Sequence, residues 1–156
     1  MTPTPPNRIP WPPLIYILAA AASVIADWLM PLPWVPSPLS DLLVAIGGLC
    51  IFAALAIDFS AMGKMRKAKT PIMPTHSAEH LVTNGAFSFS RNPIYLGNTL
   101  LMFGVALVYG SVWFIVFGLI AAYAVQKLAI EREERHLAQR FGKKYHDYAK
   151  RVRRWI

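Results

Sequence analysis

The stretch of sequence that decides the fold reads IYLGNTLLMFGVALVY over residues 94–109, then Gly110-Ser111, then VWFIVFGLIAAYAVQKLAI over residues 112–130. A helix that crosses a bilayer needs about 17–25 mostly apolar residues, so the second run is long enough and the first is slightly short. The first run gains length if its helix opens at Pro93, because proline is tolerated in the first helical turn. Since two residues leave almost no loop, we predict a tight antiparallel pair of membrane helices.

Two more apolar runs precede this pair, at residues 14–30 and 39–59. Of the 156 residues, 55% are hydrophobic and 15% are charged, whereas soluble domains average about 25% charged residues. This balance argues against an ordinary water-soluble enzyme. We predict an all-α membrane protein with about four transmembrane helices, folded as a single integral membrane domain over residues 1–156. Residues 1–13 are expected to form a proline-rich arm before the first helix.

The basic residues are concentrated in two regions. Residues 60–93 hold five Lys or Arg and residues 127–156 hold ten, whereas residues 31–38 and the turn between the last two spans hold none. Since cytoplasmic connections of membrane proteins are enriched in basic residues, we predict that both termini and residues 60–93 face the cytoplasm. The formal net charge of +8 then lies next to anionic lipids and does not indicate a nucleic-acid partner. We expect a multi-pass protein of the inner membrane of a prokaryote.

Residues 131–156 carry apolar residues at helical spacing. The repeat consists of Leu137, Phe141, Tyr145, Tyr148, Val152 and Trp155. It predicts a cytoplasmic amphipathic helix that lies on the membrane surface. Gly142 interrupts the pattern, so we expect a kink or a break near this residue.

Three of the eight acidic residues, Glu131, Glu133 and Glu134, cluster where the last span ends. A carboxylate at the edge of a membrane needs a cationic partner or a hydrogen-bond donor. The partner is either a neighbouring basic side chain, such as Lys127 or Arg135, or a polar ligand held between this junction and residues 60–93. The sequence alone leaves both interpretations open.

The loop of residues 60–93 ends in LVTNGAFSFSRNP, from Leu81 to Pro93. Gly85 indicates a tight turn, and Pro93 indicates the opening of the next helix. The free N–H groups and the positive dipole end of a helix N-terminus suit an anionic group. We therefore consider this segment as one wall of a pocket.

These segments resemble the motifs of the isoprenylcysteine carboxyl methyltransferase and phospholipid N-methyltransferase superfamily of integral membrane enzymes. The matching pieces are L-V-T-N-G-A-F at 81–87, R-N-P-I-Y-L-G at 91–97, and E-E-R-H-L at 133–137 followed by Phe141, Gly142, Tyr145 and Tyr148. They occur in the order of the family, bracket a helical pair, and cover residues 80–155. Two positions depart from the family pattern, since Ala86 stands in place of Pro and Asn92 in place of His.

The resemblance implies S-adenosylmethionine as the cofactor, held at the cytoplasmic end of the bundle by residues 60–93 and 131–156. The cofactor-binding residues that it implies are Leu81, Val82, Gly85, Phe87, Asn92, Pro93, Tyr95, Leu96, Glu133 and Glu134. Asn92 is able to donate a hydrogen bond to the cofactor but cannot act as a base near neutral pH. Arg91 and Tyr95 are the expected catalytic residues. The expected contacts of an anionic acceptor are Arg91, Arg151 and Arg154, because arginine pairs a carboxylate bidentately.

The implied reaction is an in-line transfer of a methyl group to a small or lipidic acceptor that enters from the bilayer. A carboxylate or thiolate acceptor arrives ionised, so holding the acceptor in line is the main requirement. The sequence does not choose among carboxylate, thiol, amine and phospholipid acceptors.

Three other functions are compatible with a small membrane protein. A four-helix transporter would use a membrane-embedded acid, and Asp27, Asp41 and Asp58 are available. A non-catalytic membrane scaffold would need no site, and a relative of sterol reductases would bind a nicotinamide cofactor. The transporter and the scaffold do not explain the loop and Glu-Glu motifs, and the short chain argues against the reductase.

The four histidines give no clear metal site. His76 and His80 are four residues apart, but no third ligand follows at a suitable spacing, so we expect no metal. His136 and His146 are interpreted as solvated positions on the C-terminal helix.

Overall fold

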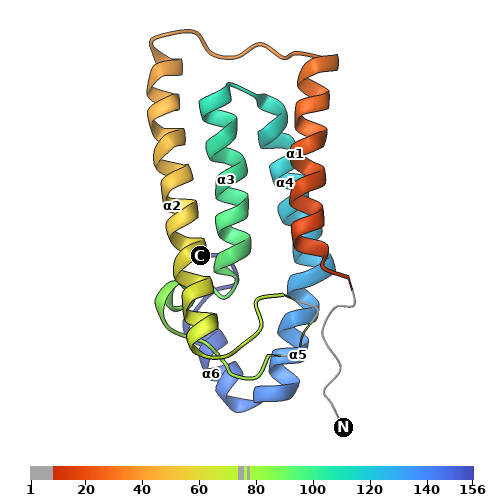
Figure 1. Ribbon diagram of the computed structural model, residues 1–156, viewed down its shortest axis with the longest axis vertical. Coiled ribbons are helices and arrows are strands. Elements are labelled where there is room, and N and C mark those ends of the chain that lie inside the picture. Colours follow the sequence, from red (N-terminus) through yellow and green to blue (C-terminus); the bar gives the residue numbers. More distant parts are fainter. Residues whose placement is uncertain (1–8, 74–75, 77) are drawn as a thin grey trace.

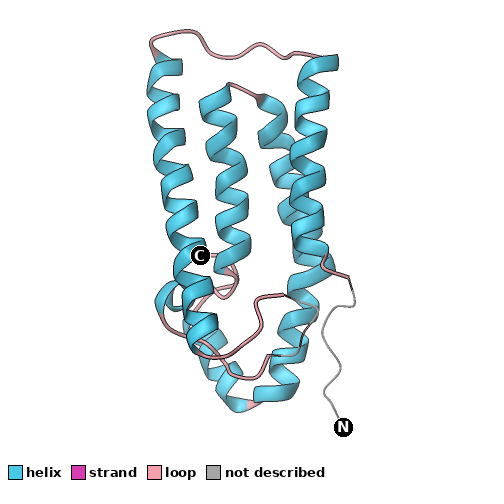
Figure 2. Ribbon diagram, viewed as in Figure 1, coloured by secondary structure: helices cyan, strands magenta, loops and turns pink. Residues whose placement is uncertain are grey.

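The protein consists of helices joined by turns and loops, with no strand among the described residues (Figure 2). The computed structural model describes residues 9–73, 76 and 78–156, so the first eight residues of the predicted arm lie outside it. The helices are α1 (Trp11–Leu29), α2 (Leu39–Lys67), α3 (Pro93–Tyr109), α4 (Val112–Val125), α5 (Glu131–Phe141) and α6 (Lys143–Arg151). A short 3-10 turn, η1 (Gly85–Ser88), precedes α3, and a π-helical turn, η2 (Gln126–Ile130), joins α4 to α5.

Four of these helices form an apolar bundle. α1, α2 and the continuous helix that begins with α4 are long and apolar enough to cross a membrane, and α3 is a shorter apolar helix. Large apolar side chains point outward, among them Leu49, Phe52 and Trp28, which are 70%, 74% and 82% exposed. A water-soluble protein rarely exposes such side chains over a wide surface. The predicted fold class, an all-α multi-pass membrane protein, is therefore confirmed.

Small residues allow α3 to lie close to α2. A Cβ atom on Gly47 of α2 would lie 2.8 Å from the carbonyl oxygen of Gly104 of α3, and one on Gly104 would lie 2.7 Å from Ile51. Membrane helices associate through such close packing, because lipid chains supply no hydrophobic driving force between them. α4 packs against both α3 and α1, and α1 and α2 flank α3 on opposite sides (Figure 1).

The turn between α3 and α4 closes one end of the bundle. Gly110 adopts a left-handed φ of 78°, and the Ser111 side chain caps α4. Ser111 Oγ also donates a hydrogen bond to Asp27 Oδ2 of α1 at 2.5 Å. The Trp113 indole N–H donates to the carbonyl of Met30 at 2.9 Å. The tight hairpin predicted from two connecting residues is present, and Asp27 serves to join α1 to it.

The observed start of α1 and the observed end of α2 differ from the predicted bounds. α1 begins at Trp11, inside the predicted arm, because Pro12 is accommodated in the first helical turn. α2 continues to Lys67 and takes up the first part of the predicted loop 60–93. The C-terminal region divides at Gly142, whose φ is 50°, as the sequence predicts.

The apolar face of α5 and α6 packs inside the protein. Tyr145, Tyr148 and Val152 are buried together and pack against Leu81 and Leu137. α5 continues the line of α4 away from the bundle, and α6 turns back below the end of α2 (Figure 1). The prediction that this face lies on the membrane surface is therefore corrected, because the segment that precedes α3 covers it.

Candidate active site

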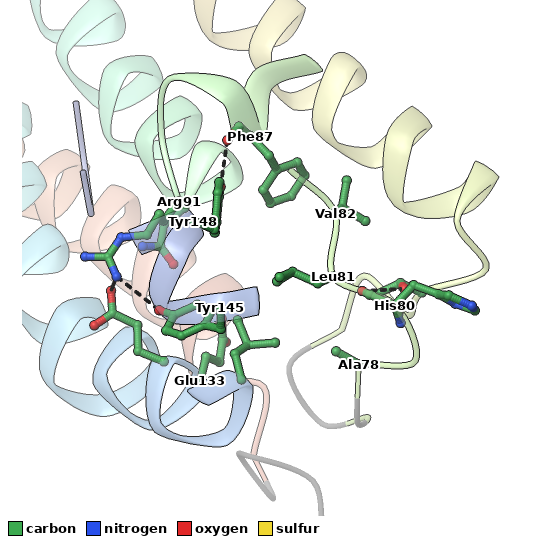
Figure 3. A pocket seen from close by; sticks show the side chains of 13 residues that line it. Ala78, His80, Leu81, Val82, Phe87, Arg91, Glu133, Tyr145 and Tyr148 are labelled. Carbon is green, nitrogen blue, oxygen red and sulfur yellow. Dashed lines mark hydrogen bonds and ion pairs between the residues drawn. The ribbon is translucent and has the colours of Figure 1, made fainter. Parts of the chain in front are cut away.

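A pocket lies at the end of the bundle where α5, α6, the start of α3 and the segment after α2 meet (Figure 3). Its volume is about 490 Å³, including the open space at its mouth. Leu81 and Val82 lie on one side, and Arg91, Tyr145 and Glu133 lie on the other. The lining residues are Thr70, Ala78, His80, Leu81, Val82, Phe87, Arg91, Asn92, Glu133, Glu134, Leu137, Tyr145 and Tyr148. We refer to this cavity as the main pocket.

Glu134 is the centre of an ion-pair network in the wall of the main pocket. Arg154 binds it bidentately, with Nε 3.0 Å from Oε1 and Nη2 2.7 Å from Oε2. Arg91 Nη1 lies 3.3 Å from Oε1 of the same carboxylate. The hydrogen bonds to Glu134 raise the pKa of the Arg154 guanidinium. Glu134 therefore holds two arginines, which are the cationic partners that its position at the end of the span requires.

Arg91 joins this network to the pocket. Its Nη1 also donates a hydrogen bond to Tyr145 Oη at 3.1 Å, and its side chain is only 16% exposed. Its Nε is buried and has no hydrogen-bond partner among the described residues. A buried guanidinium donor without a partner is costly, so this atom is the one that a bound anion would satisfy.

Two tyrosines of α6 complete the same wall. Tyr148 Oη donates a hydrogen bond to the carbonyl of Phe87 at 2.6 Å. Burial raises the pKa of Tyr148 and of Tyr145, although the nearby Arg91 charge acts in the opposite direction. Both phenols therefore stay protonated at neutral pH, and Tyr148 ties α6 to η1.

Glu133 lies on the same helical turn but has a different partner. Tyr95 Oη donates a hydrogen bond to Glu133 Oε1 at 2.7 Å. The backbone of Tyr95 is in turn held by α1, because Tyr16 Oη donates a hydrogen bond to the Tyr95 carbonyl at 3.0 Å. Glu133 has no ion-pair partner among the described residues, so its carboxylate is available to a cationic ligand.

The chain after α6 returns to the start of α3. The Arg91 backbone N–H donates to the carbonyl of Arg153 at 3.0 Å, and Asn92 Nδ2 donates to the carbonyl of Arg154 at 3.0 Å. The Trp155 indole N–H donates to Gln126 Oε1 at 2.8 Å. Asn92 occupies the N-cap position of α3, but its side chain makes no cap hydrogen bond. Its amide therefore fastens the C-terminal tail, a role that the sequence did not suggest.

Two smaller pockets share Glu133 with the main pocket. The second pocket, of about 430 Å³, lies between the segment after α2 and α5. The third, of about 280 Å³, lies between Met65 at the end of α2 and Tyr95 at the start of α3. The second pocket is lined by Pro71, Ile72, Met73, His76, Ala78, Tyr95, Glu133, His136 and Leu137. Glu133 thus lies in the wall between the main pocket and the second pocket.

The structure brings most of the predicted site residues together. Leu81, Val82, Phe87, Arg91, Asn92, Glu133 and Glu134 line the main pocket, and Pro93 and Tyr95 line the third. Gly85, Leu96 and Arg151 are not among the described lining residues of these three pockets. Arg154 does not line these three pockets. It pairs with Glu134 and lines a surface hollow that also borders Arg91 and Tyr145.

Gly85 makes the tight turn that the sequence predicts, but it does not line the main pocket as the resemblance implies. Its φ is 62°, and an added Cβ would lie 2.9 Å from the Lys64 side chain of α2. The left-handed backbone and the close approach of α2 both require a small residue here. The residue shapes the turn before α3 and does not itself face the main pocket.

Sequence reasoning missed several lining residues. They are Thr70, Ala78, His80, Leu137, Tyr145 and Tyr148 in the main pocket, and His136 in the second. Leu137 and the two tyrosines belong to the motif of the C-terminal region, which carried the available signal. His136 was interpreted as solvated, but it is only partly exposed and its Nε2 is buried.

Among the described residues, no group of three or more His, Cys, Asp or Glu side chains is placed to hold a metal ion. His80 instead contacts Thr70, whose hydroxyl exchanges hydrogen bonds with the His80 backbone at 3.1 Å.

The apolar helices, with pockets that contain charged residues at one end of the bundle, define the class of multi-pass membrane proteins. The model of the phospholipid methyltransferase family matches residues 42–144, which is more than half of the chain. The chain therefore belongs to the phospholipid methyltransferase family, within the superfamily that its motifs resemble, and is a membrane methyltransferase. This membership favours the methyltransferase over the transporter, scaffold and reductase alternatives. Comparison with curated proteins and with solved structures gives no match.

Proposed function

We propose that the protein transfers a methyl group from S-adenosylmethionine to an amine at the end of a lipidic molecule. The observation that carries this proposal is the position of Glu133, held by Tyr95 in the wall shared by the main and second pockets. A cofactor in one pocket and an acceptor in the other would meet at this wall.

The main pocket fits the cofactor by its donors and its apolar lining. The free Nε of Arg91 would bind the carboxylate of the methionine part, and Glu133 would accept hydrogen bonds from the ribose hydroxyls. Leu81, Val82 and Phe87 supply the apolar wall for the adenine ring.

Bound there, S-adenosylmethionine supplies an electrophilic methyl group on a positively charged sulfur, which keeps the electron pair of the broken carbon–sulfur bond. The protein contributes position and charge. Glu134 holds Arg91 in place by their 3.3 Å contact, and Tyr148 holds Phe87. Orientation of this kind supplies up to roughly 7–11 kcal/mol of a barrier.

The second pocket favours an amine acceptor. Its described lining contains Glu133, Tyr95 and two histidines but no Lys or Arg. A carboxylate or thiolate in this pocket would face the Glu133 carboxylate without a balancing cation, whereas an ammonium group would pair with it. Pro71, Ile72 and Met73 offer an apolar wall to the rest of the acceptor. The name of the family, phospholipid methyltransferase, supports the same class.

We propose that the pocket end of the bundle faces the cytoplasm. Lys64, Arg66 and Lys67 lie at the end of α2, and the basic C-terminal region lies beside it, whereas the opposite connections carry no Lys or Arg. The positive-inside rule supports this orientation. A location in the inner membrane of a prokaryote stays our expectation.

Purified protein in detergent tests the cofactor and the acceptor separately. Calorimetry should show binding of S-adenosylmethionine and no binding of NADPH, and Glu133→Gln should weaken that binding. Labelled methyl groups should then pass to vesicles that contain phosphatidylethanolamine and not to vesicles of phosphatidylcholine alone. Binding of NADPH in preference to S-adenosylmethionine would overturn the cofactor. Transfer to a prenylcysteine carboxylate in preference to the amine would overturn the acceptor.

A further inference from the structure

The second pocket contains a polar atom that the function described so far does not use. His136 of α5 lines this pocket together with Glu133 and Tyr95. Its Nε2 is buried and has no hydrogen-bond partner among the described residues. Glu133 and His136 are three residues apart on α5 and therefore lie on one face of the helix.

We propose that His136 accepts the proton that the acceptor ammonium must lose before it can be methylated. This proposal rests on the amine acceptor of the proposed function and adds a catalytic residue to it. A primary alkyl ammonium has a pKa near that of lysine, about 10.4. At neutral pH it carries no free electron pair, so it cannot attack a methyl carbon.

In the proton transfer, one N–H bond of the ammonium breaks, its electron pair stays on the nitrogen, and the proton is bound at His136 Nε2. The freed pair then forms the new nitrogen–carbon bond. Since the His136 side chain is only partly buried, the proton is then released to solvent. An imidazole suits this task because its ordinary pKa, about 6.5, lets it gain and lose a proton near neutral pH.

The other groups that face the second pocket have different roles. Burial raises the pKa of Glu133 to about 7, although the hydrogen bond from Tyr95 acts in the opposite direction. In its ionised form Glu133 supplies the negative charge that attracts the ammonium. Tyr95 is the donor in the hydrogen bond to Glu133 and carries its own proton. His76 enters from the segment after α2 and has contacts of its own. Burial, and in addition the charge of Arg140 one turn further along α5, lower the pKa of His136, so its imidazole is unprotonated at neutral pH.

The test compares His136→Gln with the unsubstituted protein and with His146→Gln as a matched control. His146 is exposed on α6 and lines the surface hollow beside Arg154, outside the main and second pockets. Methyl transfer to vesicles of phosphatidylethanolamine and phosphatidylcholine is measured from pH 5.5 to 9.5 with saturating S-adenosylmethionine. General-base catalysis typically contributes about 10²–10⁴-fold, so we expect the rate of His136→Gln to fall about 100-fold at pH 7.

The pH profile separates a proton acceptor from a structural residue. Since burial and Arg140 lower the pKa of His136 from its ordinary value of about 6.5, the unsubstituted protein and His146→Gln should lose activity only as the pH falls below that value. His136→Gln should instead gain activity steadily up to the highest pH, because only the acceptor's own ionisation then controls the rate. An unchanged profile in His136→Gln would overturn the proposal. Loss of the pH dependence in Glu133→Gln, with His136→Gln unaffected, would overturn it in favour of the carboxylate.

A binding measurement keeps the proposal testable without turnover. Phosphoethanolamine, a soluble amine probe, should shift the imidazole NMR signal that disappears in His136→Gln, and should leave the His146 signal in place. A His136 signal that does not respond while the probe binds would overturn the proposal. If the unsubstituted protein transfers no methyl group to any vesicle, the proposed function fails and this proposal fails with it. If the unsubstituted protein is active and His136→Gln has the same activity and pH profile, the proposed role of His136 is wrong while the proposed function stands.

Discussion

The two ends of the helical bundle differ in whether their polar side chains have hydrogen-bond partners. At the α3–α4 turn, Ser111 binds Asp27, and Trp113 binds the carbonyl of Met30, so these groups are satisfied between neighbouring helices. At the pocket end, Arg91 Nε and His136 Nε2 are buried without a partner among the described residues. No buried unpaired side-chain atom occurs at the turn end in the part of the chain that the structure describes.

This difference separates stability from binding. An unpaired buried polar group lowers the stability of the fold by about 1–3 kcal/mol. At an end that only closes the bundle, nothing compensates for this loss. An end that binds a polar ligand keeps such groups for the ligand. The comparison therefore predicts that substitutions at the turn end change stability alone, and that substitutions at the pocket end change binding as well.

The largest effect is expected from Glu134→Ala. This change removes the partner of both Arg91 and Arg154 and leaves their charges unpaired. Breaking a partly buried ion pair costs about 3 kcal/mol, so the affinity for S-adenosylmethionine should fall about 100-fold in calorimetry. Glu131→Ala is the matched control, because the 2.7 Å pair of Glu131 and Lys127 is exposed and its loss should leave affinity unchanged. Equal affinities of the two variants would show that the network does not support the site.

A smaller effect is expected from Tyr148→Phe, which removes the 2.6 Å hydrogen bond to Phe87. Chemical denaturation at pH 7 should show a loss of about 1–2 kcal/mol, together with weaker cofactor binding. Burial raises the pKa of Tyr148 above its ordinary value, so its stabilising contribution is complete below about pH 10 and is lost as the pH rises toward the folded-state pKa. The difference in stability between the two proteins should therefore shrink above about pH 10. A constant difference up to pH 11 would contradict this assignment.

The smallest effect is expected from Ser111→Ala at the turn end. The change removes the cap of α4 and the partner of Asp27, which should lower stability by about 1 kcal/mol. Affinity for S-adenosylmethionine should stay the same within error. A variant that loses affinity as Glu134→Ala does would show that the two ends are coupled and would break the comparison.

The sequence predicted the turn end more fully than the pocket end. The apolar runs, the Gly110-Ser111 turn and Pro93 are local signals, and each led to the correct helix. The motifs around Arg91 and Glu134 contain most of the predicted residues that line the main pocket, whereas Gly85, Leu96 and Arg151 do not line it. The helix signals depend on residues close together in the chain, and their physical causes are helix length, turn geometry and capping.

The rest depended on contacts between distant segments. The spacing of Tyr145 and Tyr148 showed an apolar face but not that the segment before α3 covers it. Asn92 carried a capping signal, yet its amide is used by the returning tail. The C-terminal helix pattern predicts a solvated His136, whereas this residue is partly buried and lines the second pocket beside the segment after α2. No periodicity marks that segment.

The π-helical turn η2 sets the direction in which the acidic residues point. A π turn holds one residue more than an α turn of the same span, and one residue corresponds to about 100° of rotation about a helix axis. Glu133 and Glu134 lie in the first turn of α5, the helix that follows η2. The extra residue therefore rotates the short helix α5 relative to the membrane span. The span can then present its side chains to the lipid while α5 presents its carboxylates to the pockets. A chain that lost one residue within 126–130 would keep its span and its acidic pair, but would aim the carboxylates away from both pockets.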